Sequence, residues 1–211
     1  YTFRGGSGAW NRASSWSPPG IPSPNDAVQC NAGALQLPAG STFTVVDATF
    51  GTASGDWCII NGTAADSTLV VTASLRLLHA QFLGAGALVV RNASIYAGSP
   101  FREMPISLWT FAMHGACTVT GNWLAHRMSL LTLVAGATVL MDATTASAPA
   151  ATLLLDTPLR VESGAALRIA AGTTLGMERS NVFLAGSSFT VDDAVVPGAG
   201  GGLQVYQFYS T

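Results

Sequence analysis

The 211-residue chain is poor in charge: only 9% of its residues are charged and its formal net charge is −2, whereas soluble domains average about 25% charged residues. It contains no lysine, which excludes P-loop and Schiff-base chemistry and, with the near-neutral balance, a basic nucleic-acid interface. Its mean hydropathy is +0.40, but residues 128–141 are too short for the roughly 20 apolar residues of a membrane helix, and Pro105 and His114 interrupt residues 104–125. We expect no membrane insertion.

Residues 1–30 are rich in turn-forming and aromatic residues, and the chain opens at Tyr1 without an initiator Met, which fits a processed chain or a fragment. The segment contains Gly8-Ala-Trp10-Asn-Arg-Ala-Ser-Ser-Trp16-Ser-Pro-Pro-Gly-Ile-Pro22-Ser-Pro-Asn-Asp26-Ala-Val28. We interpret it as a cap in which Trp10 and Trp16, with Pro22, cover the apolar end of the domain. Asp26 is predicted to accept hydrogen bonds from turn amides. The alternative is that both tryptophans form a platform for sugar stacking.

This spacing of Trp, Trp-Ser, Pro and Asp-x-Val resembles the entry segment of large secreted bacterial β-helix proteins, including autotransporter-like adhesins. The resemblance is close over residues 10–28 and looser beyond them, where Gly-small-x-apolar-x-apolar units follow. It implies a right-handed parallel β-helix displayed outside the cell. It implies no particular ligand, because such modules are used as stalks, adhesins and enzyme scaffolds.

One pattern recurs along residues 31–196: two apolar residues in alternation, a Gly followed by a small residue, then two more apolar residues in alternation. Full copies span residues 35–45, 131–141, 159–169 and 167–177, and shorter relatives span 82–90 and 182–191. Each copy predicts two short strands that meet at a bend where Gly supplies the backbone freedom. The repetition predicts an all-β solenoid with coils of roughly 20 to 28 residues. A β-sandwich or jelly roll is the alternative.

The predicted domains are a cap over residues 1–30, a solenoid body over 31–196, and a Gly-rich hinge with a C-terminal strand over 197–211. In the last segment, the alternating apolar side chains suit strand pairing; they are Leu203, Val205, Tyr206, Phe208 and Tyr209. We expect residues 203–211 to add to a neighbouring copy and build head-to-tail assemblies, and the alternative is that they pack on their own body.

Three cysteines and two sequons complete the candidate sites. Cys30 and Cys58 lie 28 positions apart, close to one coil, and are expected to form a disulfide that leaves Cys117 over; three buried free thiols are the alternative. Asn61 and Asn92 open N-x-S/T sequons, and we expect both to lie on exposed turns or strand edges.

No catalytic or metal motif is recognisable. His79, His114 and His126 are scattered, and the His114-x-x-Cys117 spacing lacks a second ligand pair. Asp192 and Asp193 are adjacent, so on a strand they point to opposite faces and cannot act as a glycosidase pair.

The sequence therefore predicts a non-enzymatic, extracellular structural protein without cofactors, a subunit of a fibre, coat or adhesive layer whose partners are its own copies and possibly glycans. A carbohydrate-binding or polysaccharide-active β-helix protein is the alternative.

Overall fold

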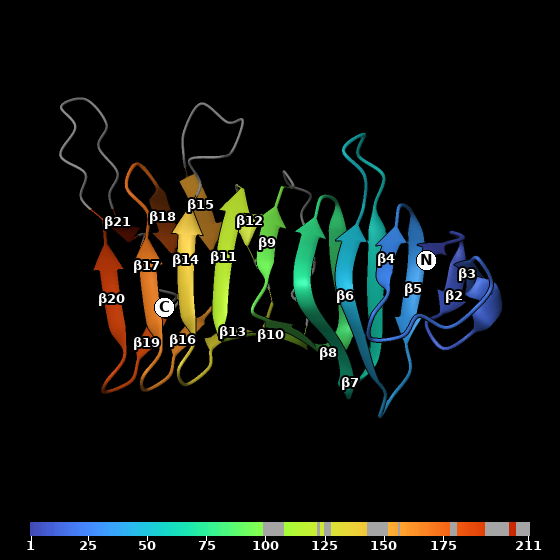
Figure 1. Cartoon of the computed structure of the whole chain (residues 1–211), viewed down its shortest axis with the longest axis horizontal. Coiled ribbons are helices and arrows are strands. Elements are labelled where there is room, and N and C mark those ends of the chain that lie inside the picture. The colour runs from blue at the N-terminus through green and yellow to red at the C-terminus, as the bar shows by residue number, and fades with distance from the viewer. Residues whose placement is uncertain are drawn as a thin grey trace, which may run out of the picture.

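The computed structural model describes residues 1–98, 108–121, 123–124, 128–142, 152–155, 157–177, 181–192 and 203–205. Within these residues nearly all regular structure is β-strand, and the only helix is one 3-10 turn, η1, at Ala13–Ser15. The strands stack along a single axis as a parallel β-helix of about seven turns (Figure 1). The predicted all-β solenoid is confirmed, and the sandwich alternative is wrong.

Each coil offers three strand positions, which we call faces 1, 2 and 3. Face 1 starts with β2 (Ser7–Ala9), β5 (Gly33–Leu37) and the first residues of β7 (Cys58–Leu77) and β8 (Ala80–Arg91). Further along the chain, a separate four-stranded sheet takes the same place in the coil order; it comprises β12 (Trp123–Leu124), β15 (Thr152–Leu155), β18 (Thr174–Met177) and β21 (Leu203–Val205).

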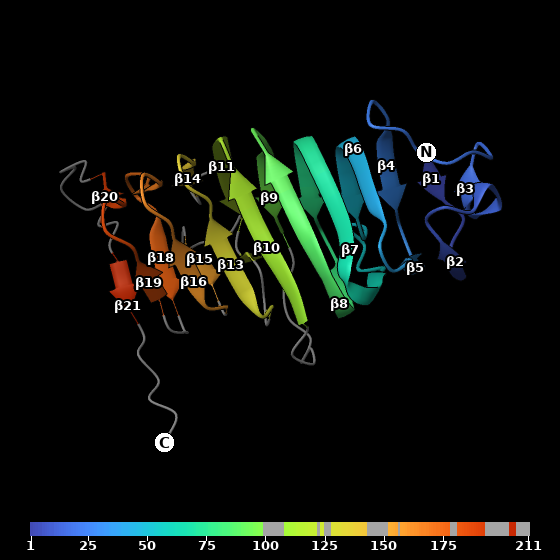
Figure 2. The same cartoon turned by 90° about the horizontal axis from the view of Figure 1, so that it is seen from below.

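Faces 2 and 3 belong to one 17-stranded sheet that bends at the coil corners (Figure 2). Face 2 comprises the start of β6 (Thr42–Phe50), the middle of β7, the end of β8, and then β10 (Leu108–His114), β13 (Leu130–Leu133), β16 (Leu159–Val161) and β19 (Asn181–Phe183). Face 3 comprises β1 (Thr2–Phe3), β4 (Ala27–Cys30), the ends of β6 and β7, β9 (Ser94–Ala97), β11 (Ala116–Gly121), β14 (Thr138–Asp142), β17 (Ala166–Ile169) and β20 (Ser188–Val191). Among the described strands, the only antiparallel pairing joins β1 to β3 (Trp16–Ser17).

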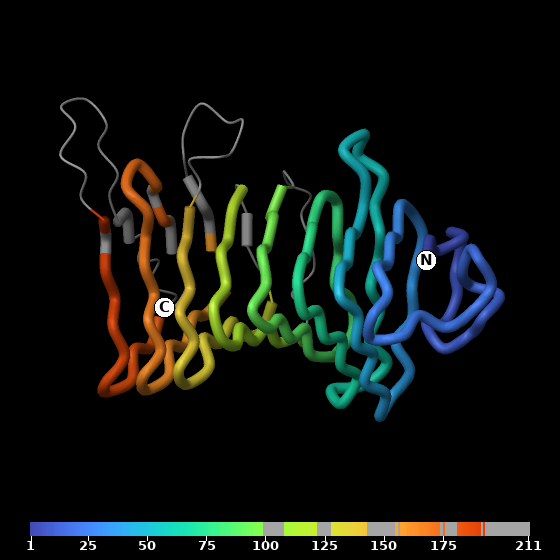
Figure 3. The backbone as a smooth tube through the Cα atoms, in the orientation of Figure 1, coloured from blue at the N-terminus to red at the C-terminus, as the bar shows by residue number. Residues whose placement is uncertain are grey.

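On each face, alternate side chains of every strand point into the solenoid, and those of successive coils stack on one another as continuous apolar columns. On face 3 the column is Val28, Ala48, Leu75, Ile95, Val119, Met141 and Ile169, all at most 3% exposed. With Val191, which continues the register, successive members lie 20, 27, 20, 24, 22, 28 and 22 residues apart. These coil lengths confirm the predicted range. Figure 3 shows the backbone winding through these successive turns.

The corners confirm the predicted role of glycine in the repeated unit. In the four full copies the glycine has a positive φ, a conformation that L side chains rarely adopt: Gly40 (65°), Gly136 (77°), Gly164 (75°) and Gly172 (77°). Gly186, in the last shorter copy, has φ of 81°. The repeat therefore marks the points at which one face turns into the next.

The predicted cap segment also contributes strands to the solenoid. β1 pairs with β4 and β2 pairs with β5, so residues 1–30 belong to the first coil. In the part of the chain that the structure describes, no helix is long and apolar enough to cross a membrane.

Candidate functional site: the two ends of the solenoid

The N-terminal end of the solenoid is closed by aromatic side chains. Trp10 and Trp16 are fully buried, with ring centroids 5.0 Å apart in an edge-to-face arrangement. Trp10 also lies 5.3 Å from Phe43, and Phe3 lies 5.8 Å from Trp16, measured between ring centroids. The Trp16 indole Nε1 donates to the Trp10 carbonyl at 2.8 Å. We call this cluster the closed end; its burial confirms the predicted aromatic cap and leaves neither tryptophan free for sugar stacking.

Pro22 and Asp26 lie in the segment that runs from the cap into β4. Pro22 is buried, and the Asp26 carboxylate accepts a 2.7 Å hydrogen bond from the Ser23 amide, as predicted. Hydrogen bonds from Ser23 hold the pKa of Asp26 below its ordinary value of 3.8. Asp26 therefore orders the turn before the first long strand.

A disulfide ties the first two coils together. Cys30, at the end of β4, and Cys58, at the start of β7, are bonded with their Cα atoms 5.8 Å apart. Both are fully buried, so the cross-link lies inside the solenoid wall. The predicted pairing is confirmed.

The opposite end leaves core positions exposed. On face 2 the inward column runs Val45, Val71, Val90, Met113, Leu133, Val161 and Phe183. Its first six members are 0% exposed, whereas Phe183 is 40% exposed. Phe189 of β20 packs against Phe183 with ring centroids 5.7 Å apart. Val182, 49% exposed, is in register with the exposed Arg160 and therefore faces outward on the side of the solenoid.

Within the described residues, the last strands at this end also have a strand neighbour on one side only. Among the described strands, β19, β20 and β21 pair with the preceding coil alone. We call these three strands, with Phe183 and Phe189, the open end.

In this single chain, the residues that form β21 adopt the alternative arrangement, in which the C-terminal segment packs on its own body. Leu203–Val205 pairs in parallel with Leu175–Met177 of the same chain, because the preceding coil presents a free strand edge in register at a much higher effective concentration than another molecule could. Tyr206, Phe208 and Tyr209 lie outside the described residues.

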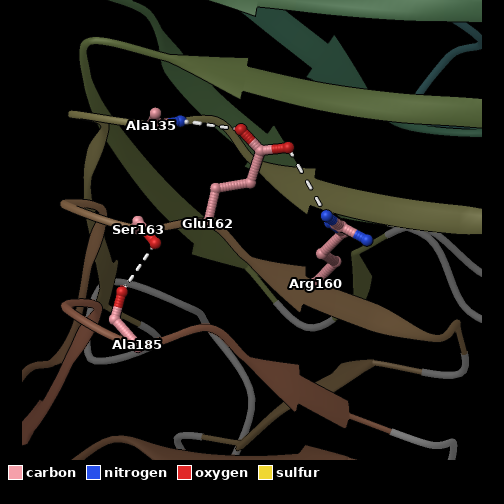
Figure 4. A network of polar contacts seen from close by, with 5 residues as sticks. All are labelled: Ala135, Arg160, Glu162, Ser163 and Ala185. Carbon is pink, nitrogen blue, oxygen red and sulfur yellow. Dashed lines mark hydrogen bonds and ion pairs between the residues drawn. The ribbon is translucent and has the colours of Figure 1, made fainter.

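Polar side chains at the corner between faces 2 and 3 link successive coils, as Figure 4 shows. A carboxylate oxygen of Glu162 accepts a 3.1 Å hydrogen bond from the Ala135 amide one coil earlier, and its other oxygen lies 3.7 Å from Arg160 Nε. Ser163 donates 2.6 Å to the Ala185 carbonyl one coil later. Glu162 therefore has a structural role, because its carboxylate bonds to the neighbouring coil.

The two sequons lie in different settings. Asn92 is exposed at the turn between β8 and β9, as predicted, with φ of 49°, and its Oδ1 accepts a 3.0 Å hydrogen bond from the Ala116 amide of the next coil. Asn61 is half-buried inside β7, paired with Gln36 on one side and Leu83 on the other. Its predicted place on a turn or strand edge is wrong, because the strand continues through the sequon on both sides.

Among the described residues, His79, His114 and Cys117 form no reactive cluster. Cys117 is free and buried, its Sγ lies 3.4 Å from the His114 carbonyl, and burial raises its thiol pKa, which disfavours the reactive thiolate. Burial and the nearby Arg91 lower the pKa of His114, with Glu162 acting in the opposite direction. His79 Nδ1 lies 2.6 Å from the Thr52 carbonyl, and His126 is outside the described residues.

Asp192 is also held in an ion pair. Arg168 Nε donates to both carboxylate oxygens of Asp192, at 2.8 and 2.7 Å, and Asp193 is outside the described residues. Within the described ranges, no group of three or more His, Cys, Asp or Glu side chains could hold a metal ion.

The chain matches no protein-family model, no curated protein and no solved structure. What remains distinctive is therefore the asymmetry of the solenoid, closed at one end and open at the other. The sequence located the closed end through its tryptophans but did not predict the exposure of Phe183, because the alternating pattern of β19 is the same as that of a buried strand.

Proposed function

We propose that this chain is a non-enzymatic extracellular structural protein, a β-solenoid subunit of a fibre, coat or adhesive layer that associates with copies of itself. The observation that carries the proposal is the open end, where a position buried in six preceding coils is 40% exposed at Phe183. Monomeric proteins rarely leave such apolar surface and strand edges unprotected. A contact with another molecule would bury both.

Two further observations support an export compartment and a structural role. A buried disulfide is typical of oxidising environments outside the cytosol. Polar side chains such as Glu162, Ser163 and Asn92 bond to adjacent coils. The burial of Trp10 and Trp16 weighs against the alternative of sugar binding on these two residues.

Sedimentation velocity over a wide concentration series, with electron microscopy of the same samples, tests the proposal. We expect the mean mass to rise with concentration and elongated particles to appear. In parallel, incubation with a panel of soluble and crystalline polysaccharides should release no reducing sugar. A chain that stays monomeric at every concentration, or that cleaves a polysaccharide, would overturn the proposal.

A further inference from the structure

The corner between faces 3 and 1 differs from the other corners because its length changes from coil to coil. Two residues connect β7 to β8 there, seven connect β6 to β7 and eleven connect β20 to β21. Among the described strands, connections from face 2 to face 3 contain at most four residues. In repeat proteins, insertions that gather on one side often mark the binding side. The seven-residue loop after β6 lies on this edge, at the top of Figure 1.

This loop is anchored at both ends. At its start, Gly51 has a φ of 81°, and its backbone runs so close to the next coil that a Cβ would lie 2.4 Å from the His79 amide nitrogen. At its end, the Trp57 carbonyl accepts a 3.1 Å hydrogen bond from the Gly33 amide, and the disulfide-bonded Cys58 follows. The loop is therefore ordered without a ligand, which lowers the entropic cost of binding one.

Two aromatic rings meet beside the loop. Trp57 and His79 are both half-buried, with ring centroids 5.3 Å apart and planes at 78°. His79 Nδ1 donates to the Thr52 carbonyl at 2.6 Å. Because a carbonyl oxygen can only accept, the proton of the neutral imidazole lies on Nδ1, and Nε2 is left as an acceptor.

A carboxylate lies next to this pair in the loop. Asp56 is exposed, and its Oδ2 accepts hydrogen bonds from the Thr52 and Ser54 hydroxyls at 3.1 and 3.3 Å. Within the described part of the chain, Asp56 Oδ1, His79 Nε2 and Trp57 Nε1 have no hydrogen-bond partner, and the two ring nitrogens are accessible to water. The cluster thus offers one free donor and two free acceptors around an indole.

These groups suit a neutral ligand that carries several hydroxyls. A pyranose ring has an apolar C–H face that packs on an indole, and its hydroxyls both donate and accept hydrogen bonds. The Trp57 Nε1 donor and the acceptors of Asp56 and His79 match such hydroxyls. A cation would use the indole face and the carboxylate but would leave the Nε1 donor without a partner.

We propose that Trp57, His79 and Asp56 form a saccharide-binding site on the edge between faces 3 and 1. A pyranose ring stacks on the Trp57 indole, and its hydroxyls bond to Asp56 Oδ1 and His79 Nε2. The site goes beyond the proposed function, because association between copies does not need it. An adhesive layer built from such subunits would present one glycan site on every copy.

Titration with defined saccharides tests the site. Cellohexaose, chitohexaose, mannohexaose and xylohexaose are titrated one at a time into the wild type by isothermal titration calorimetry. In parallel, the indole N–H signals in NMR spectra report which tryptophan responds. The indoles of Trp16 and Trp109 serve as internal references, since both donate to backbone carbonyls.

Three variants accompany the wild type. Trp57→Ala removes the indole, and Trp57→Phe keeps an aromatic face but removes the Nε1 donor. Tyr96→Ala is the matched control, because Tyr96 is another half-buried aromatic residue, on face 3 and in contact with Arg76. Circular dichroism and thermal unfolding first establish that each variant folds like the wild type.

We expect at least one of the four saccharides to bind and to shift the Trp57 indole signal, with the Trp16 and Trp109 signals unchanged. Trp57→Ala should weaken binding about tenfold or more, and Trp57→Phe should weaken it less. Tyr96→Ala should bind like the wild type. If Trp57→Ala does not fold, Trp57→Phe and the indole shifts of the wild type decide the outcome.

Other outcomes overturn the inference. A wild type that binds none of the four saccharides, or binding that Trp57→Ala leaves unchanged, would exclude the site. Equal weakening by Tyr96→Ala would indicate unspecific contact with aromatic side chains. A Trp57 signal that responds to tetramethylammonium and to no saccharide would indicate a cation site instead. All these results leave the sedimentation test of the proposed function unaffected, so the two proposals can fail separately.

Discussion

Removing the disulfide between Cys30 and Cys58 should destabilise the protein by an amount set by its place in the chain. The bond closes a loop with a sequence separation of 28 residues. In the chain-entropy model, opening a loop of that length costs about 3 to 4 kcal/mol of unfolding free energy at 25 °C. For a chain of this size the loss corresponds to a fall of about 6 to 16 °C in Tm.

The assay is urea unfolding, followed by circular dichroism, of the Cys30→Ala/Cys58→Ala variant and the wild type. Cys117→Ala is the control, since this cysteine is also buried but free, and its loss of buried sulfur should cost only about 1 kcal/mol. Comparing reduced with oxidised wild type separates the cross-link from packing, because both contain the same side chains. If the double variant and the reduced wild type were no less stable than the Cys117→Ala control, the disulfide would not stabilise the protein by constraining the unfolded chain.

Three further changes probe the cap, the coil contacts and the corner. In chemical denaturation, Trp16→Phe should lower the free energy of unfolding by about 1 kcal/mol more than Trp10→Phe does. Trp16→Phe removes the hydrogen bond from Nε1 to the Trp10 carbonyl, whereas Trp10 Nε1 has no hydrogen-bond partner. Equal losses in the two variants would contradict this. Gly62→Ala should prevent folding, as judged by circular dichroism, because the new Cβ would lie 1.9 Å from the Ala85 carbonyl oxygen. In the control Gly136→Ala, the Cβ meets no atom within 4 Å, so only backbone strain of about 1 to 2 kcal/mol is expected. Folding lowers the pKa of His114, so below about pH 6.5 the unfolded chain takes up a proton more readily than the folded one, and the protein should lose stability as the pH falls. In thermal melts at pH 7.5 and 5.5, the fall in Tm between the two pH values should be smaller for His114→Gln than for the wild type.

The sequence was most informative where one local unit carries the whole signal. The repeated unit predicted its own corners, and glycines such as Gly136 and Gly164 have the positive φ that the unit requires. The spacing of Cys30 and Cys58 likewise worked because a disulfide between neighbouring coils needs about one coil of intervening chain. Both signals lie within a single coil or between adjacent ones.

Predictions failed where the outcome depended on pairing between distant strands. Asn61 belongs to a sequon that fits a turn, yet Gly62 lies against the Ala85 backbone of the next coil, so its glycine allows close approach between strands. The fate of Leu203–Val205 depended on whether β18 offered a free edge in register. Phe183 illustrates the same limit, since alternation predicts that its side chain points inward but cannot predict that it is 40% exposed.

The stacking of coils also gives the molecule a direction of mechanical weakness. Hydrogen bonds between coils run along the solenoid axis, so a pull applied at the two ends would load one rung after another and peel coils away singly. Each released coil of 20 to 28 residues would lengthen the tether by about 7 to 10 nm. The Cys30–Cys58 bond closes one of these coils, so the residues between the two cysteines could not extend under force until the disulfide is reduced.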